Sequence, residues 1–535
     1  MEAAAESQSA ELERGAARVG NVRAAVAAAS ALAAGLALRI WMVKEFFDVN
    51  GDSLIYGGLA KNLLLHGQFA FSAAGGALVP TLIRLPGYPL FLALCFKLFG
   101  MENYYSAACV QVAMDLASCL LLADFARRVA PEDYKRGAAL ATLWLAALCP
   151  FTASYAAFPL TETPTIFMLA LAMWSMARFR ERPGWGNALG FTFAVTAAAL
   201  LRPDGALAAV AFAPALLMNF GRERRPFQGR PPCGFQDPRF TAGGEGAAST
   251  AGWETGATFQ RAIRIAPGKL ARMAVVCALL ALAPFGVWAA RNWNVFHVFE
   301  PLAPRLANDP GEATYPGWER WVKSWCLDFV STYEIYWNVP GDKLDVSELP
   351  SRAFDTPQQH AETVALAHAY ESNGEDLSPE IDAGFGRLAA ERIAAHPLRY
   401  YVWLPLGRVA DMWLRPRVEN LPIDLDWWVY AHHHVETEFS WAYLALNAVY
   451  LALAIAGLLL RPRMSTPRTK TCPWGPRFGV ALLTYMLLRS ALLLTVEAPE
   501  ARYTLECFPM LFVLGGTWVA WATRRVYLRP LSSKA

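Results

Sequence analysis

Charged residues are unusually scarce in this 535-residue sequence. Only 17% of its residues are Asp, Glu, Lys or Arg, whereas 55% are hydrophobic. Soluble domains carry about 25% charged residues, and a soluble surface this poor in charge would aggregate. Intrinsic disorder is also excluded for most of the chain, because a disordered chain needs low hydrophobicity. The composition therefore indicates a protein that crosses a membrane several times.

Several functional motifs are missing as well. The nine cysteines form no CxxC pair, so the usual spacing of a zinc or redox site is absent. No glycine-rich nucleotide-binding loop and no repeat of solenoid length is found. The net charge of +3 is too small to indicate nucleic-acid binding, and we expect no nucleic-acid partner.

Long apolar runs, in contrast, are plentiful. A spanning helix needs about 20 apolar residues, and the first such run extends from about Val22 to Met42. A cleaved signal peptide is the alternative for this run, but its length and its end at Arg39-Ile40-Trp41 favour an uncleaved helix. Together with the later runs it predicts about ten crossings. The later runs begin near Tyr104, Gly137, Thr161, Gly186, Asp204, Leu270, Phe439, Phe478 and Leu505.

The basic residues predict the orientation of the chain. Lys and Arg accumulate in the cytoplasmic loops of membrane proteins. If the N-terminus is cytoplasmic, each inside connection is rich in basic residues, whereas the short outside turns contain only Arg202 and Arg502. Both termini are therefore predicted to be cytoplasmic. The inside residues are Arg127, Arg128, Lys135, Arg136, Arg178, Arg180, Arg182, Arg222, Arg224, Arg225, Arg230, Arg461, Arg463, Arg468, Lys470, Arg524, Arg525 and Arg529.

Three extramembrane segments divide the predicted all-α polytopic bundle. An N-terminal catalytic module, 1–290, contains the first outside loop, 43–103, with juxtamembrane helices, and a flexible Gly- and Pro-rich cytoplasmic insertion at 221–268. Residues 291–440 are predicted to form a mostly helical outside loop, and 441–535 the C-terminal spanning helices. Within the outside loop, the apolar but charged stretch HPLRYYVWLPLGRVADMW favours an interfacial helix.

Ionisable residues that are far apart in the sequence fall on the predicted outside face. A single such residue at a helix end is explained by contact with lipid head groups. The convergence of several acids and arginines beside apolar helices indicates a functional site instead. Its members are Asp48, Asp52, Glu162, Arg202, Asp204, Glu497, Glu500 and Arg502.

The first outside loop contains two further patterns. Asp52 precedes a short amphipathic helix, because Ile55, Leu59 and Leu63 recur at helical spacing. An acid at this position also stabilises the N-terminus of the helix, and that role would hold its carboxylate in place. The segment RLPGYPLF, which begins at Arg84, predicts a turn at the membrane surface that could shape a substrate cleft.

These segments resemble the GT-C glycosyltransferases of the family-39 type, which include dolichyl-phosphate-mannose protein mannosyltransferases and the bacterial lipid A aminoarabinose transferase. The similar segments are GDSLIYGGLAKNLLLHGQF, RLPGYPLFLALCFKLFG, LTETPTIFMLALA, LLRPDGALA, ARNWNVFHVFEPLAP and PEARYTLECFPMLFVLGG. The resemblance implies transfer of a sugar from a polyprenyl-phosphate carrier to an acceptor on the outer face. In bacteria this is the periplasmic face of the inner membrane.

The resemblance also implies roles for individual residues. The family's catalytic carboxylate matches Asp52, with Asp48 as the rival, and Glu162 matches a second acidic position. Arg502-Tyr503 matches a C-terminal pair whose arginine would meet the carrier phosphate. Unlike the mannosyltransferases, this sequence has serine rather than glutamate after Asp52 and no separate soluble domain in its central loop. The acceptor, whether lipid, glycan or protein, therefore stays open.

The expected reaction is a displacement at the anomeric carbon of a hexosyl or pentosyl donor. Asp52 would act as general base on the acceptor hydroxyl, with partial burial raising its pKa. Guanidinium groups would bind the departing phosphate. One base and one attacking face imply inversion, whereas a retaining route would need a nucleophilic carboxylate. The predicted phosphate-binding residues are Arg502, Tyr503, Arg202, Arg84 and Tyr56.

Two alternatives stay open at this stage. A divalent cation could bind the oxygens of Glu162 and Asp52, and His432-His433-His434 could be a metal tract, although its place before a helix favours a solvated or interfacial run. The rival function is a transporter or flippase of a lipid-linked substrate. Transporters place their sites near the bilayer midplane between repeated halves, whereas here the acids lie at helix ends and the halves do not mirror each other.

Overall fold

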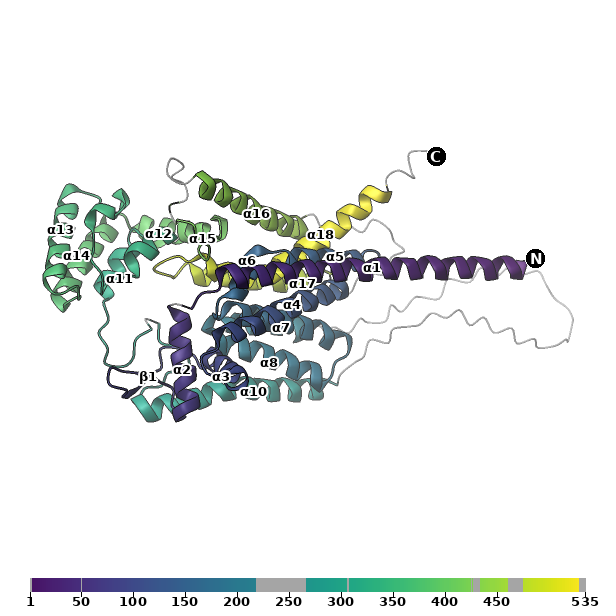
Figure 1. Cartoon of the computed structure of the whole chain (residues 1–535), viewed down its shortest axis with the longest axis horizontal. Coiled ribbons are helices and arrows are strands. Elements are labelled where there is room, and N and C mark those ends of the chain that lie inside the picture. The colour runs from purple at the N-terminus through teal and green to yellow at the C-terminus, as the bar shows by residue number, and fades with distance from the viewer. Residues whose placement is uncertain are drawn as a thin grey trace, which may run out of the picture.

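A bundle of long helices carries a separate helical layer at one end (Figure 1). The computed structural model describes residues 2–49, 51–217, 266–305, 307–424, 426, 434–459 and 475–528. Over these residues the only sheet is a hairpin of β1 (Ala70–Ser72) and β2 (Leu78–Pro80), paired through Phe71 and Val79. The predicted all-α polytopic fold is confirmed.

Five described helices are long and apolar enough to cross a membrane. Each of them begins near one of the predicted crossings. Their qualifying parts are Gly20–Phe46 of α1 (Glu2–Phe46), α4 (Tyr104–Val129), α10 (Pro267–Phe296), α16 (His434–Leu459), and Ala501–Arg525, which joins η6 (Ala501–Cys507) to α18 (Phe508–Leu528).

The other predicted crossings fall on helices that are broken, shorter or more polar. The pair α5 (Lys135–Ala147) and α6 (Pro150–Ala157) bends by 50° and makes a sixth span if it is counted as one. The total of about ten therefore stays a prediction. The remaining helices are α7 (Glu162–Glu181), α8 (Trp185–Leu201), η1 (Pro203–Ala206) with α9 (Leu207–Leu217), and α17 (Gly475–Leu493).

A buried arginine stabilises the break between α5 and α6. Pro150 opens α6, and a helix break frees carbonyl groups that are costly to leave unpaired in a bilayer. Arg39 of α1 donates to the carbonyl oxygens of Ala146 (3.3 Å) and Ala147 (2.7 Å). Its Nε also donates to Asp115 Oδ2 of α4 at 2.7 Å, and both side chains are buried. One ion pair thus ties three helices around the bend.

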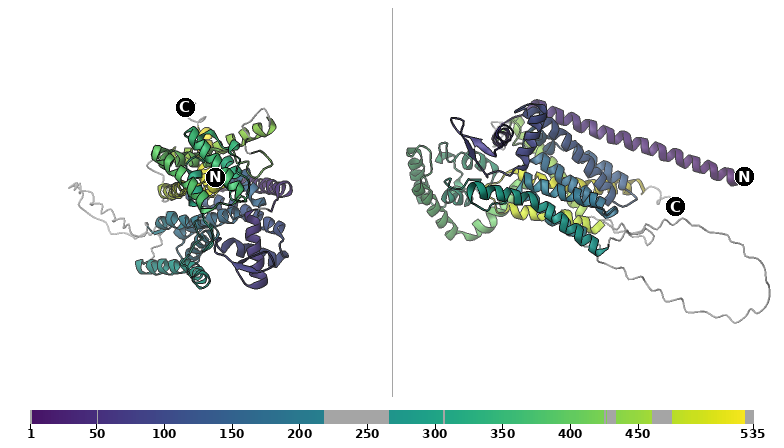
Figure 2. Two further views of the ribbon diagram at one scale, coloured as in Figure 1. Left: turned by 90° about the vertical axis from the view of Figure 1, so that its left-hand side faces the viewer. Right: turned by 90° about the horizontal axis from the view of Figure 1, so that it is seen from below.

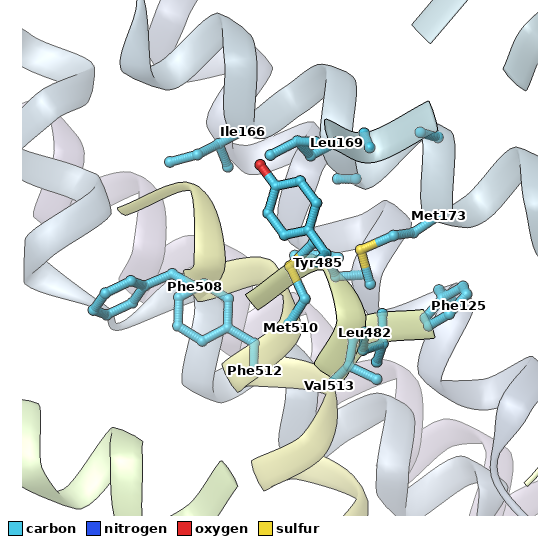
Figure 3. Packing of buried hydrophobic residues seen from close by; sticks show 14 of the residues in the cluster. Phe125, Ile166, Leu169, Met173, Leu482, Tyr485, Phe508, Met510, Phe512 and Val513 are labelled. Carbon is cyan, nitrogen blue, oxygen red and sulfur yellow. The ribbon is translucent and has the colours of Figure 1, made fainter. Parts of the chain in front are cut away.

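The main apolar core lies between the N-terminal helices and the last two. Figure 3 shows Met173 and Tyr485 within this core and the rings of Phe508 and Phe512 side by side. Helices in a membrane associate mainly through close packing, which small residues permit. A Cβ atom on Gly516 of α18 would lie 2.2 Å from Thr142 Oγ1 of α5, and one on Gly457 of α16 would lie 2.3 Å from a carbonyl oxygen of α18. Glycine at these two positions lets the three helices touch.

The predicted outside loop forms the helical layer. Its main helices are α11 (Pro316–Lys323), α13 (Pro357–Ser372) and α14 (Pro379–Ala395), around a core that includes Trp318, Trp321 and Phe385. Asp382 accepts hydrogen bonds from the backbone N–H groups of Gly317 (3.1 Å) and Trp318 (2.8 Å), so a carboxylate closes the N-terminus of α11. The mostly helical character expected of this loop is confirmed.

The predicted interfacial segment becomes η5 (Arg399–Trp403) and α15 (Leu404–Leu414). It keeps large apolar side chains on the surface: Tyr401 is 64% and Trp403 is 67% exposed. Aromatic side chains of this kind suit the boundary between lipid and water.

The helical layer and the two chain termini lie at opposite ends of the molecule. In Figures 1 and 2 the start of α1 and the end of α18 lie at the end opposite to the helical layer. The hairpin, α2 (Asp52–His66) and α3 (Gly87–Phe99) lie toward the layer. The assignment of the termini to the cytoplasm stays a prediction, and most of the predicted insertion 221–268 lies outside the described residues.

Candidate active site

Asp52 is the first residue of α2, as expected. Gly51 precedes it with a φ of 44°, a left-handed conformation that turns the chain into the helix. Of the predicted apolar stripe, Leu59 is fully buried, whereas Ile55 and Leu63 are only partly buried. The Asp52 carboxylate lies in the first turn, where the helix dipole favours a negative charge.

Two arginines meet the Asp52 carboxylate. Arg84 Nη2 donates to Asp52 Oδ1 at 2.8 Å, and Arg502 Nη2 donates to Oδ2 at 3.3 Å. Arg84 arrives from the turn before α3, where a Cβ on Gly87 would lie 2.5 Å from the carbonyl oxygen of Leu200. The predicted turn therefore packs directly against the end of α8.

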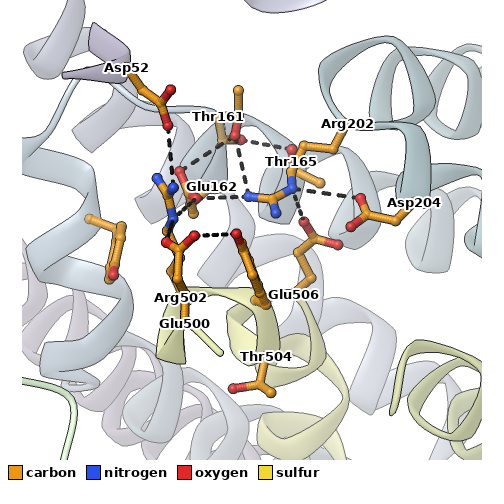
Figure 4. Close-up of polar contacts among 12 residues, drawn as sticks. Asp52, Thr161, Glu162, Thr165, Arg202, Asp204, Glu500, Arg502, Thr504 and Glu506 are labelled. Atoms are coloured by element: carbon orange, nitrogen blue, oxygen red, sulfur yellow. Dashed lines mark hydrogen bonds and ion pairs between the residues drawn. The ribbon is translucent and has the colours of Figure 1, made fainter. Parts of the chain in front are cut away.

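Glu162 links two arginines from distant turns. It begins α7 and is 1% exposed. Its Oε1 lies 2.8 Å from Arg202 Nη1 and 3.8 Å from Arg502 Nε (Figure 4). Because Arg502 contacts both Asp52 and Glu162, the two predicted acidic positions belong to one network.

Arg502 is held from its own turn as well. Glu500 Oε2 accepts from Arg502 Nε at 2.5 Å, and the Tyr503 hydroxyl donates to Oε1 of the same glutamate. The guanidinium groups of Arg202 and Arg502 lie over the Tyr503 ring, 5.6 Å and 5.8 Å from its centroid. Figure 4 shows Asp52 of α2, Glu162 of α7, Arg202 from the end of α8 and Arg502 of η6 converging.

The sequence reasoning missed the buried end of this network. Glu506 lies 3.0 Å from Arg202 Nε and 3.4 Å from Arg489 Nη1, and Arg489 also pairs with Asp204. Glu506 and Arg489 are fully buried. An ionisable residue inside an apolar run was the available signal, since such residues are costly in a membrane unless they pair.

The side chains around Asp52 are the most exposed part of the network. The side chains of Asp52, Arg84 and Arg502 are 25%, 23% and 20% exposed, whereas Glu162 and Glu506 are 1% and 0% exposed. A ligand from solvent or from the lipid surface would therefore meet Asp52, Arg84 and Arg502 first.

The expected direction of the Asp52 pKa is wrong. Burial acts to raise this pKa, but the charges of Arg502 and Arg84 outweigh burial, and the pKa lies below its ordinary value. Tyr56, one turn further along α2, has its pKa raised to about 12 by burial and by the Asp52 charge. Its ring stacks edge-on against Tyr88 at 5.0 Å and lies 5.9 Å from the Arg84 guanidinium.

Asp48, the predicted rival of Asp52, has different surroundings. It is exposed, and its carboxylate accepts a hydrogen bond from the backbone N–H of Val49 at 2.8 Å. The ion pairs described for the network involve Asp52 instead. Asp52 is therefore the acid that both Arg84 and Arg502 contact.

The acidic side chains of the network lie against arginines. Within the described ranges, no group of three or more His, Cys, Asp or Glu side chains could hold a metal ion. Arg502 lies against both Asp52 and Glu162, so a cation shared by the two acids would have to displace it. His432 and His433 lie outside the described residues, and His434 begins α16.

Comparisons with known proteins bear on part of the chain. The family model for dolichyl-phosphate-mannose-protein mannosyltransferase matches residues 80–230, which include Arg84, Glu162 and Arg202. No curated protein matches the chain.

Two crystal structures of ArnT from Cupriavidus metallidurans are similar at low scores. The one bound to undecaprenyl phosphate has 12% identity and a TM-score of 0.36, over 94% of this chain and 79% of ArnT. The apo structure has 13% identity and a TM-score of 0.34, over 95% and 78%. The superposition is loose in both cases. The resemblance predicted from the sequence is confirmed by the family match: over residues 80–230 the chain is similar to the mannosyltransferase family of GT-C glycosyltransferases.

Proposed function

We propose that this protein is a membrane glycosyltransferase that moves a hexosyl or pentosyl group from a polyprenyl phosphate to an acceptor hydroxyl on the outer face. One observation carries the proposal. Asp52 and Arg502, the expected base and the expected phosphate ligand, lie 3.3 Å apart although 450 positions separate them in the sequence. A base and a phosphate-binding cation side by side are what displacement at a phosphate-linked anomeric carbon requires.

The carrier phosphate is proposed to bind at the exposed end of the network. Arg84 and Arg502 are its ligands, because guanidinium groups bind phosphate through paired hydrogen bonds. Both already contact Asp52. An incoming phosphate would therefore compete with the Asp52 carboxylate for these groups.

This competition would prepare the base. With its pKa lowered by two arginines, Asp52 is ionised at neutral pH but is a weak base. When the phosphate draws the guanidinium groups away, burial would dominate and the basicity of Asp52 would rise. Donor binding and activation of the base are thus one event.

The chemistry then balances in a single step. The acceptor oxygen attacks the anomeric carbon, the bond from that carbon to the phosphate oxygen breaks, and the acceptor proton passes to Asp52. The charge left on the polyprenyl phosphate is met by Arg502 and Arg84. Attack on the face opposite to the leaving phosphate gives inversion. Glu162 and Glu500 would hold Arg502 in place during this step.

The proposal includes a location. The active end of the bundle is placed on the outer face, which is the periplasmic face if the membrane is a bacterial inner membrane, with both termini in the cytoplasm. The charge asymmetry of the loops supports this orientation. The bilayer holds the donor tail, and the acceptor is a lipid, a glycan or a protein.

Mass spectrometry of lipid-linked sugars, surface glycans and glycoproteins tests the function. Cells that express the intact chain should contain a sugar-modified product that is absent without the gene and absent with Asp52→Asn. The matched control is Asp48→Asn, which should keep the product. An unchanged product with Asp52→Asn would overturn the role of this carboxylate. A lipid-linked sugar that changes sides without any new glycosidic bond would favour a flippase instead.

A further inference from the structure

The turn that presents Arg502 begins in a segment held by the helical layer. Lys323, the last residue of α11, donates to the carbonyl oxygen of Thr495 at 2.7 Å and to Glu497 Oε1 at 2.8 Å. Arg305 Nη2 donates to the same carboxylate oxygen at 2.5 Å. Two cations of the layer therefore hold Glu497, five residues before Arg502.

The next two residues are held by the layer as well. Ala498 is 9% exposed and is part of the apolar core built from α11 and α14. The carbonyl oxygen of Pro499 accepts a hydrogen bond from Thr332 Oγ1 at 3.2 Å. Glu500, which follows, is the residue that pairs with Arg502 in the network. The backbone thus passes from the layer to the candidate site without a free residue between them.

The Lys323–Glu497 pair is more than an exposed surface contact. Its side chains are only 16% and 19% exposed, whereas Arg305 is 74% exposed. Ion pairs gain strength when they are withdrawn from water, while exposed pairs contribute little. Burial acts to raise the pKa of Glu497, but its bonds to Lys323 and Arg305 outweigh burial and keep the pKa below its ordinary value. Lys323 is therefore the stronger of the two contacts.

The far side of the same turn is also fixed. Arg417, in the segment after α15, donates to the carbonyl oxygen of Ala501 at 2.7 Å and to Thr504 Oγ1 at 2.5 Å. With one end held by Lys323 and the other by Arg417, the turn has little freedom to move. A group that must bind phosphate within a few tenths of an ångström needs such support.

We propose that Lys323 is a positioning residue of the sugar transfer: by holding Thr495 and Glu497 it sets the turn that places Arg502 against the carrier phosphate. This inference rests on the proposed function. If the inference is right, the helical layer contributes to donor binding. The similarity to the family covers residues 80–230 and does not include this layer.

The first test measures the affinity of the purified full-length chain for undecaprenyl phosphate. Lys323→Gln should raise the Kd about fivefold, because Arg502 is no longer held in place. Lys323→Arg should restore binding, and Glu497→Gln should match Lys323→Gln. The control is Lys343→Gln, which removes an exposed pair with Glu371 in the same layer and should leave the Kd unchanged. Thermal unfolding of each variant verifies that the fold is intact.

A double-mutant cycle with Arg502→Lys separates positioning from a general structural effect. If Lys323 acts through Arg502, Lys323→Gln should add little to the Kd once Arg502 is replaced. An unchanged Kd for Lys323→Gln, or its full effect in the Arg502→Lys background, would overturn the inference. An unchanged Kd for Arg502→Lys alone would instead contradict the proposed function.

Discussion

Two buried charge networks in this molecule are built differently. The pair of Arg39 and Asp115 joins one cation to one anion, and the same guanidinium group also donates to two backbone carbonyls at the α5–α6 bend. The network around Arg502 shares this cation among Asp52, Glu162 and Glu500 and reaches solvent at Asp52.

This difference indicates that the Arg39–Asp115 pair stabilises the fold, whereas the network around Arg502 can bind a ligand. An arginine bound to fixed carbonyls can leave them only if the helix break is exposed, so the Arg39 pair is a part of the fold. The Asp52 carboxylate is bound by two arginine side chains that are partly exposed, so both of them can turn from it to a ligand. Only the second arrangement can exchange an internal partner for a ligand, and this is why we place chemistry there and not at the bend.

The largest expected effect on the rate of transfer comes from replacing the Asp52 carboxylate, which belongs to the network around Arg502. Asp52→Asn should lower the rate of sugar transfer by about a thousandfold, the scale of a lost general base. Its thermal unfolding should change little, since the side chain is partly exposed and keeps its shape. If Asp52→Asn lost activity and stability in proportion, Asp52 would have a structural role like that of the Arg39–Asp115 pair, and the proposed difference between the two networks would be wrong.

The same substitution in the Arg39–Asp115 pair should lower the stability of the protein and leave the rate of transfer unchanged. Asp115→Asn leaves the Arg39 charge buried without a partner, which costs about 3 kcal/mol of stability. Denaturation of the detergent-solubilised protein should reveal the loss, and the rate per folded molecule should stay near that of the parent chain. A normal unfolding midpoint would show that the pair does not stabilise the bend.

The pH dependence of transfer sharpens the idea of partner exchange. Without donor, the pKa of Asp52 is below its ordinary value, so kcat/KM should fall only when the pH drops below about 4, the usual pKa of an aspartate. With donor bound, the arginines turn to the phosphate, and the acid limb of kcat should lie at higher pH. Folding stability follows the same sign: the contribution of the Asp52 pairs is present above the unfolded pKa and is lost as the pH falls through the lowered one. Coincident acid limbs for kcat and kcat/KM would argue against exchange.

The smallest expected effect concerns the aromatic neighbour of Arg84. Tyr56→Leu removes the ring that lies 5.9 Å from the guanidinium, and a cation–π contact of this exposure contributes about 0.5–1 kcal/mol. Binding of undecaprenyl phosphate should weaken about threefold. Tyr56→Phe keeps the ring and should bind normally. Equal losses in both variants would assign the effect to the hydroxyl group instead.

The sequence was sufficient for the five long apolar helices and for the grouping of Asp52, Glu162 and Arg502, because helix ends that are assigned to one side of a membrane are expected to lie close together. The sequence did not predict that Glu506 and Arg489 belong to the network. Both residues lie inside apolar runs, and some of their partners are distant in the sequence. The direction of the Asp52 pKa was also not predicted from the sequence. Burial and two opposite charges compete there, and only their distances decide which of them is larger.

The pairing of Asp52 with Arg84 and Arg502 has a consequence for selectivity. A free anion in solution would have to outcompete an internal carboxylate that is always present at the site, and a small anion has little else to offer. A phosphate on a long lipid tail is confined to the membrane surface, where its effective concentration is far higher. The resting ion pairs would therefore act as a filter that favours a membrane-anchored phosphate over its soluble counterparts.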